Sequence, residues 1–195
     1  MIDTYATFED LAMHTVEGQD YRIVTKKTNS PFLSIAIHGG SIEPLTSEIA
    51  SSIAGDEHNL YLFEGLRTQR NEELHIGSEY FDEPRMKDME RDAEVIISIH
   101  GYHSVGGEFV MVGGLCTELV EKIITHLQEV DIEIRQMDAL LHTESSQNIC
   151  NKGMSGGGVD IEISEKLRVA LQEDAGLYRL FTNAIRHAIE AYHIT

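Results

Sequence analysis

Residues Pro31 to Glu43 read PFLSIAIHGGSIE, and the prediction of the fold starts from this stretch. The apolar run from Phe32 to Ile37 is short, rich in β-branched side chains and bounded by a proline and two glycines. This pattern predicts a strand that is covered on both faces. His38 would then stand at the carboxyl edge of the strand, where open α/β sheets place their ligands. Glu43 lies in the following loop, so we expect both side chains to face one crevice.

A second apolar run, Val95 to Ile99, also ends in a histidine and a glycine, His100 and Gly101. If the two strands are neighbours, roughly 5 Å apart, His38 and His100 can share one metal ion. Glu43 can complete a set of two imidazoles and one carboxylate, which is typical of catalytic zinc with one coordination position left open. Two histidines packed in the core would explain the same spacing.

Strand-like and helical patterns alternate along the rest of the chain. Strands are predicted at 21–25, 59–63, 109–112, 132–135 and 159–164, with 109–112 as an edge strand. Helices are predicted at 48–54 and 115–129, and one or two closing helices at 165–192. This alternation indicates an α/β fold with an open, mixed and largely parallel sheet flanked by helices.

The composition indicates the class of protein. The 195 residues, 42% of them hydrophobic, are enough for one core, so we expect a single catalytic domain spanning 1–195. The net charge of −18 argues against nucleic acid and anionic membranes, which need a basic surface. The first residues lack the features of a signal peptide, and no apolar stretch approaches the roughly 20 residues of a membrane span. We expect a soluble protein made in the cytoplasm.

One carboxylate, Glu162, lies inside a predicted strand. The stretch 159–164 reads VDIEIS and follows three glycines, Gly156 to Gly158. Such alternation usually indicates a strand whose polar face meets solvent. A glycine-rich approach to an inward carboxylate would instead suit a residue that stands beside bound substrate. The pattern allows both interpretations.

Several motifs together resemble a known family. They are AIHGGSIEPLTSEIA, YLFEGL, LHIGSEYFDEPR, ISIHGY, NICN, and GGGVDIEIS with SEKLR. Between about Pro31 and Arg168 the chain is similar to the poly-γ-glutamate hydrolases found in phages of Bacillus and in bacterial chromosomes. The resemblance implies an α/β fold related to zinc carboxypeptidases, a single catalytic Zn²⁺, and hydrolysis of γ-glutamyl amide bonds in a glutamate polymer.

The resemblance also implies roles for individual residues. The motif histidines and glutamate that bind zinc correspond to His38, Glu43 and His100, and the general base corresponds to Glu162. Zinc carboxypeptidases usually space the first histidine and glutamate more closely than His38 and Glu43. Glu64, at the end of another predicted strand, is therefore the alternative third ligand.

Binding of the substrate carboxylates would need cationic side chains near the site. Arg85 in FDEPR and Lys152 in NICNK are the preferred candidates by motif, and His75 could bind or orient substrate. Two cations at ordinary surface positions and one histidine packed in the core would give the same sequence pattern. Further candidates by motif are Arg67, Arg70 and Arg168.

The expected partner is poly-γ-glutamate, cleaved by a monomer that lysis could release to act on extracellular polymer. Two alternatives stay open at this point. One is another zinc amidohydrolase on the same fold, such as a carboxypeptidase or an N-acyl amino acid deacylase. The other is a non-enzymatic domain that binds metal or polymer.

Overall fold

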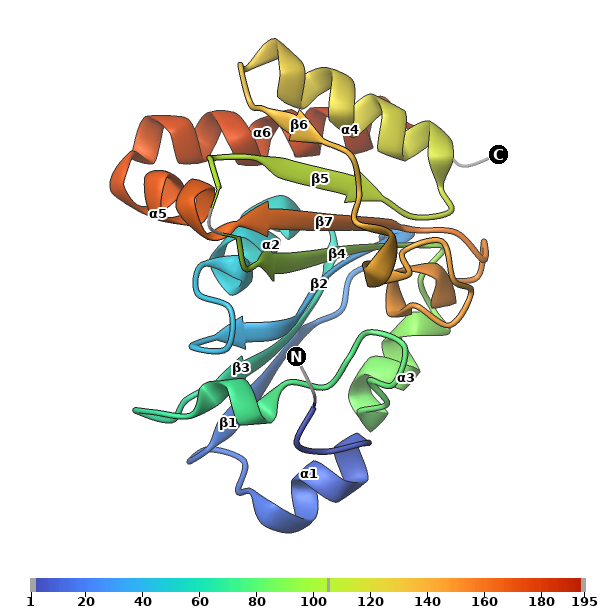
Figure 1. Cartoon of the computed structure of the whole chain (residues 1–195). Coiled ribbons are helices and arrows are strands. Elements are labelled where there is room, and N and C mark those ends of the chain that lie inside the picture. The colour runs from blue at the N-terminus through green and yellow to red at the C-terminus, as the bar shows by residue number, and fades with distance from the viewer. Residues whose placement is uncertain (1–2, 105, 194–195) are drawn as a thin grey trace.

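The computed structural model describes residues 3–104 and 106–193, which form one seven-stranded sheet with helices on both faces (Figure 1). The strand order is β1-β3-β2-β4-β7-β5-β6, from the bottom of the view to the top. The strands are β1 (Tyr21–Lys26), β2 (Phe32–Gly40), β3 (Asn59–Gly65), β4 (Val95–Tyr102), β5 (Val110–Gly113), β6 (Ile134–Arg135) and β7 (Val159–Ser164). The four central strands are parallel, whereas β1 and β5 run antiparallel to β3 and β7. The predicted mixed, largely parallel sheet is confirmed.

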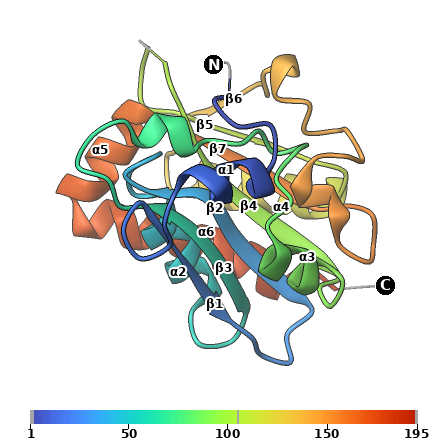
Figure 2. The same cartoon turned by 90° about the horizontal axis from the view of Figure 1, so that it is seen from below.

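Helices cover the two faces of the sheet unequally. The helices are α1 (Phe8–His14), α2 (Thr46–Ala54), α3 (Pro84–Glu90), α4 (Thr117–Glu129), α5 (Glu165–Glu173) and α6 (Ala175–Glu190). Apolar side chains of α2, α4, α5 and α6 pack on one face, and those of α1 and α3 on the other (Figure 2). No helix within the described residues combines the length and the apolar character needed to cross a membrane.

Strand β2 shows why its sequence is apolar without interruption. Phe32 and Ala36 point to the core under α2, whereas Leu33, Ile35 and Ile37 point to the core under α1 and α3. Each of these side chains is buried. Because successive residues of a strand face opposite sides, a strand covered on both faces needs apolar residues at every position.

The crossovers around β2 open a crevice at the carboxyl ends of the strands. The chain leaves β2 through α2 on one face to reach β3, then returns through α3 on the other face to β4. Strand β2 has β3 as its neighbour on one edge and pairs with β4 along the other. Ligands of open α/β sheets bind where such connections diverge. The adjacency predicted for the strands that carry His38 and His100 is confirmed.

A β-bulge determines where His38 points. Ala36 pairs with Leu62 and Gly39 with Glu64, so β2 carries one more residue than β3 over this interval. In a regular strand His38 would face the same side as Ala36, away from His100. The extra residue turns it onto the opposite face, and a bulge commonly re-aims a side chain in this way beside an active site.

One sequence expectation needs correction, and one of two open interpretations is decided. The segment predicted as an edge strand is β5, which lies between β7 and β6, so that β6 forms the edge. The alternating strand β7 does not present a polar face to solvent, since every one of its residues is buried. Its apolar side chains pack in the core under α4, α5 and α6. Its carboxylates Asp160 and Glu162 face a hollow that residues 140–142 also line.

The glycine before β7 has a packing role that can be tested. A Cβ atom at Gly158 would stand 1.9 Å from the carbonyl oxygen of Cys150 and 2.5 Å from that of Ile96. Both contacts are with backbone, so we expect Gly158→Ala to lower the free energy of unfolding by about 1–3 kcal/mol, as overpacking does. Urea denaturation measures this change. Gly106→Ala is the control, because the added Cβ would lie 3.9 Å from its nearest neighbour, the Nη1 atom of Arg135. Equal stability of the two variants would contradict the assignment.

Candidate metal centre

Three predicted ligands converge at the carboxyl ends of β2 and β4. The Nδ1 atoms of His38 and His100 lie 3.2 Å apart. Glu43, in the loop after β2, places Oε1 3.3 Å from the His38 Nδ1 and Oε2 3.8 Å from the His100 Nδ1. The backbone N–H of Gly101 donates to Glu43 Oε2 over 2.8 Å and orients the carboxylate. One imidazole from each strand and one loop carboxylate thus surround a single point.

Hydrogen bonds at the far side of each ring make the inner nitrogens available to a metal. The Nε2 of His38 lies 2.9 Å from the carbonyl oxygen of Ile76, which can only accept, so this nitrogen carries the hydrogen. The Nε2 of His100 lies 2.7 Å from the hydroxyl of Ser98, which can accept in the same way. Metal-binding histidines usually hold their second nitrogen like this. Both Nδ1 atoms, which lie 3.3 and 3.8 Å from Glu43, are then left to bind a metal ion.

The spacing fits zinc. Zn–N bonds of about 2.0–2.1 Å at a tetrahedral angle place two ligand atoms about 3.3 Å apart. The separations of 3.2 and 3.3 Å at His38 match this value, and the 3.8 Å from His100 to Glu43 needs only a small adjustment. Nitrogen and carboxylate donors are also the chemical set that zinc accepts.

Electrostatics favour a cation at the same point. Burial works against the charge on Glu43, but His38, His100 and the Gly101 N–H outweigh it and lower the pKa of this carboxyl to about 2. Burial likewise opposes a charge on His38, yet Glu43 raises the pKa of this ring above its ordinary value. Burial and the charge of His38 lower the pKa of His100 to about 3, so this ring stays neutral. The carboxylate thus attracts positive charge to the Nδ1 side.

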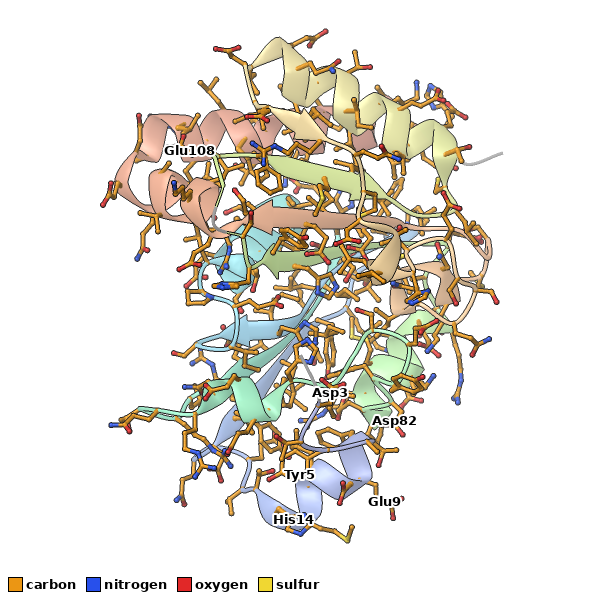
Figure 3. All side chains as sticks on the ribbon, viewed as in Figure 1. Asp3, Tyr5, Glu9, His14, Asp82 and Glu108 are labelled. Carbon is orange, nitrogen blue, oxygen red and sulfur yellow. The ribbon has the colours of Figure 1, made fainter. Side chains whose placement is uncertain are left out.

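His75 is a further ring at the site, held in place by Asp3. It stacks on His38 with ring centroids 3.9 Å apart, and His38, Glu43 and His75 offer ligand atoms within 4.8 Å of one another. Asp3 accepts from His75 Nδ1 over 2.6 Å and from the Gly77 N–H over 2.7 Å. Figure 3 labels Asp3 between α1 and the middle of the sheet. No sequence signal pointed to Asp3, because 72 residues separate it from His75.

Two buried carboxylates on β7 stand beside the histidines. Glu162 is the register partner of His100, and Asp160 that of Ser98. Both carboxylates line a hollow of about 640 Å³ together with His38 and His100. Burial, Asp160 and Glu43 hold the pKa of Glu162 well above its ordinary value. The Glu162 carboxyl therefore holds a proton more readily than an exposed glutamate does.

The sequence pattern did not identify Asp160 as a residue of the site. Burial raises the pKa of this carboxyl to about 7, in spite of a long contact of 3.4 Å from the amide of Asn148. Within the described residues no hydrogen-bond donor reaches its Oδ1 atom. Only its place in the alternating pattern of β7, two residues before Glu162, could have indicated that it faces the site.

The predicted cations lie elsewhere. Arg85 donates to both carboxylate oxygens of Glu17 over 2.9 Å and to Glu83 over 2.8 Å. Lys152 places its Nζ 3.3 Å from the carbonyl oxygen of Glu79. The structure brings neither side chain to the hollow lined by the histidines.

The alternative ligand Glu64 also lies apart from the cluster. It pairs with Arg22 across β1 and β3, where the two residues are register partners. Its side chain belongs to the alternation that faces α2, opposite to the face that carries His100. The geometry therefore favours Glu43 over Glu64 as the carboxylate ligand.

This chain is similar to known proteins over nearly its whole length. A family model described as poly-gamma-glutamate hydrolase matches residues 5–192. The UPF0714 protein YndL of Bacillus subtilis (strain 168) is 37% identical over 195 residues, which cover 99% of this chain and 75% of YndL.

Two solved structures are similar over nearly the whole chain. A bacteriophage poly-gamma-glutamate hydrolase superposes with a TM-score of 0.93 at 31% identity, covering 98% of each chain. The zinc-free apo form of YndL superposes with a TM-score of 0.90 at 33% identity, covering 99% of this chain and 100% of that one. By sequence and by fold, this chain belongs to the poly-gamma-glutamate hydrolase family.

Proposed function

We propose that this protein is a zinc-dependent hydrolase that cleaves the γ-glutamyl amide bonds of poly-γ-glutamate. The observation that carries the proposal is the convergence of His38, His100 and Glu43 on one point, with Glu162 beside them in the same hollow. The relationship to a bacteriophage poly-gamma-glutamate hydrolase supports the choice of substrate.

Each residue has a distinct task in this proposal. His38, His100 and Glu43 would hold the ion, and the Gly101 N–H keeps the glutamate turned toward it. When bound, zinc acts as a Lewis acid on the amide carbonyl and makes water acidic enough to attack near neutral pH. Glu162 accepts the proton of the attacking water and later donates it to the nitrogen of the leaving amine.

The environment of Glu162 suits this proton transfer. A carboxylate that burial and like charges make more basic takes a proton more readily than an exposed one. The positive charge of a metal ion at the neighbouring ligands would oppose the repulsion from Glu43 and Asp160, and so keep Glu162 ionised before each turnover.

Removal and return of the metal test the proposal. We expect a chelator to abolish shortening of γ-linked glutamate polymer, because the Lewis acid is then lost, and stoichiometric zinc to restore it. The measurement is polymer length by size-exclusion chromatography, with α-linked polyglutamate as the control substrate. Cleavage confined to short α-peptides or to N-acyl amino acids would identify another amidohydrolase. A zinc-loaded protein that cleaves none of these substrates would be a binding domain.

A further inference from the structure

A second hollow adjoins the metal centre and opens on the other side of Glu43. Its volume is about 330 Å³, within the range of about 300–1,000 Å³ common for ligand pockets. It shares Glu43, His75, Gly101 and His103 with the larger hollow. A chain molecule bound across the metal centre would therefore occupy both hollows, one on each side of the reacting bond.

The wall of this second hollow includes a buried arginine, Arg168, that forms no ion pair within the described part of the chain. Arg168, on α5, is 8% exposed. Its Nη1 donates to the carbonyl oxygen of Pro44 over 2.7 Å and its Nε to that of Ile163 over 3.3 Å. Among the described residues no carboxylate forms an ion pair with it, whereas Arg67 pairs with two carboxylates and Arg186 with one. A guanidinium has five N–H donors, so three of its donors remain for a ligand.

This arrangement is unusual for such an acidic chain. The net charge is −18, and a buried cation is costly unless an anion or hydrogen bonds compensate it. The two carbonyl oxygens fix the orientation of the Arg168 side chain but do not neutralise its charge. Glu43, Glu165 and Glu162 favour this charge through space, but none of them is paired with it. A ligand carboxylate would form that pair and match the planar guanidinium with two parallel hydrogen bonds.

Gly101 leaves the guanidinium room at the end of β4. A Cβ atom at this position would lie 2.7 Å from Cζ and 2.9 Å from Nη2 of Arg168, and 2.9 Å from Cβ of Glu43. Because the glycine has no side chain, the cation of Arg168 and the carboxylate of Glu43 can flank the same short piece of backbone. The cation is thereby held next to the predicted metal ligands.

The charges around the second hollow suit one carboxylate. Its acidic rim residues Glu72 and Glu165 are exposed, and Glu165 lies 3.1 Å from the ring of His103. The buried cation of Arg168 is therefore at the inner wall, where the other charge, Glu43, is turned toward His38 and His100, and the two exposed carboxylates are at the rim. An anion is attracted inside the hollow and repelled at the rim, which favours a single carboxylate at Arg168.

We propose that Arg168 binds the α-carboxylate of a glutamyl residue that flanks the scissile amide, and that it sets the preference of the enzyme for a charged polymer. The inference rests on the proposed function and adds a substrate subsite to it. In a γ-linked polymer every residue keeps its α-carboxylate, so a carboxylate is always close to the amide under attack. Arg168 is a substrate-binding residue in this proposal and takes no part in proton transfer.

Substrate discrimination tests the proposal. We compare a γ-linked glutamate oligomer with the same oligomer whose α-carboxylates are converted to primary amides. We expect the wild type to favour the charged oligomer about 10–100-fold in kcat/KM, the range expected of hydrogen bonds between charged groups. Arg168→Gln should reduce this preference to about one, and Arg168→Lys should retain part of it. Arg179→Gln, at an exposed arginine of α6, is the control and should keep the full preference.

Binding without turnover separates this proposal from the proposed function. Both oligomers are titrated by calorimetry into the Glu162→Gln protein, with and without Arg168→Gln, after thermal melting has shown that each variant is folded. If the wild type cleaves no γ-linked polymer but binding still favours the charged oligomer through Arg168, the proposed function is wrong and the subsite stands. If the preference in binding survives Arg168→Gln or Arg168→Lys unchanged, the assignment of Arg168 is wrong, whatever the cleavage assay shows.

Discussion

His100→Ala should weaken zinc binding by more than about 100-fold and abolish cleavage of γ-linked polymer. The expected loss is this large because outer partners of zinc ligands alone contribute about 10–100-fold in affinity, and this variant removes a proposed ligand. The neutral imidazole of His100 contributes the Nδ1 atom that lies 3.2 Å from its counterpart on His38. The measurement is the zinc dissociation constant by competition with a chromogenic chelator.

Ser98→Ala provides a graded comparison for this variant. It removes the hydroxyl 2.7 Å from His100 Nε2 and leaves the ring in place, so we expect a loss of only about 10–100-fold. Unchanged zinc affinity in His100→Ala would show that the ring is not a ligand. The set formed by His38, Glu43 and His75 would then be the metal site.

Glu162→Gln should lower kcat on γ-linked glutamate polymer by about 10²–10⁴-fold, the usual contribution of a general base. Glutamine keeps the size of the side chain but cannot accept the proton of water. The carboxylate is the register partner of His100, and it is not one of the predicted ligands, so zinc content and melting temperature should stay at wild-type values. The measurements are kcat, metal content and thermal melting on one preparation.

Two results would redirect this assignment. Near wild-type turnover in Glu162→Gln would move the proton acceptor to another carboxylate, and Asp160, which lines the same hollow, is then the next to replace with asparagine. Loss of zinc in Glu162→Gln would make Glu162 a ligand, and the set of His38, Glu43 and His100 would need revision.

The sequence predicted the two histidines of the site because each ends a buried strand and precedes a glycine. That local pattern was sufficient, since the two strands pair directly in the sheet. It could not reveal the extra residue in β2 that turns His38 toward His100. A bulge depends on the register with the neighbouring strand, which the sequence of β2 alone does not contain.

Partners that are distant in the chain were the hardest part to predict. The position of Glu162 beside His100 follows from β7 pairing with β4, and only the family resemblance indicated its role. Arg85 was preferred as a substrate cation, yet it is bound by Glu17 and Glu83. Ion pairs of this kind depend on tertiary contacts, and so does the lack of an acidic partner that distinguishes Arg168.

The hydrogen bonds that Asp3 accepts from His75 and Gly77 affect where another protein can be fused to this chain. Because both oxygens of Asp3 are engaged there, a tag or a second domain fused ahead of this residue would start beside the candidate metal centre, where it would compete for space with the polymer proposed as substrate. Helix α6 instead packs against α2, α4 and α5, on the face of the sheet opposite to α1. A fusion that follows α6 leaves the approach to the metal centre open, and it is the arrangement to choose for immobilising the enzyme on a surface.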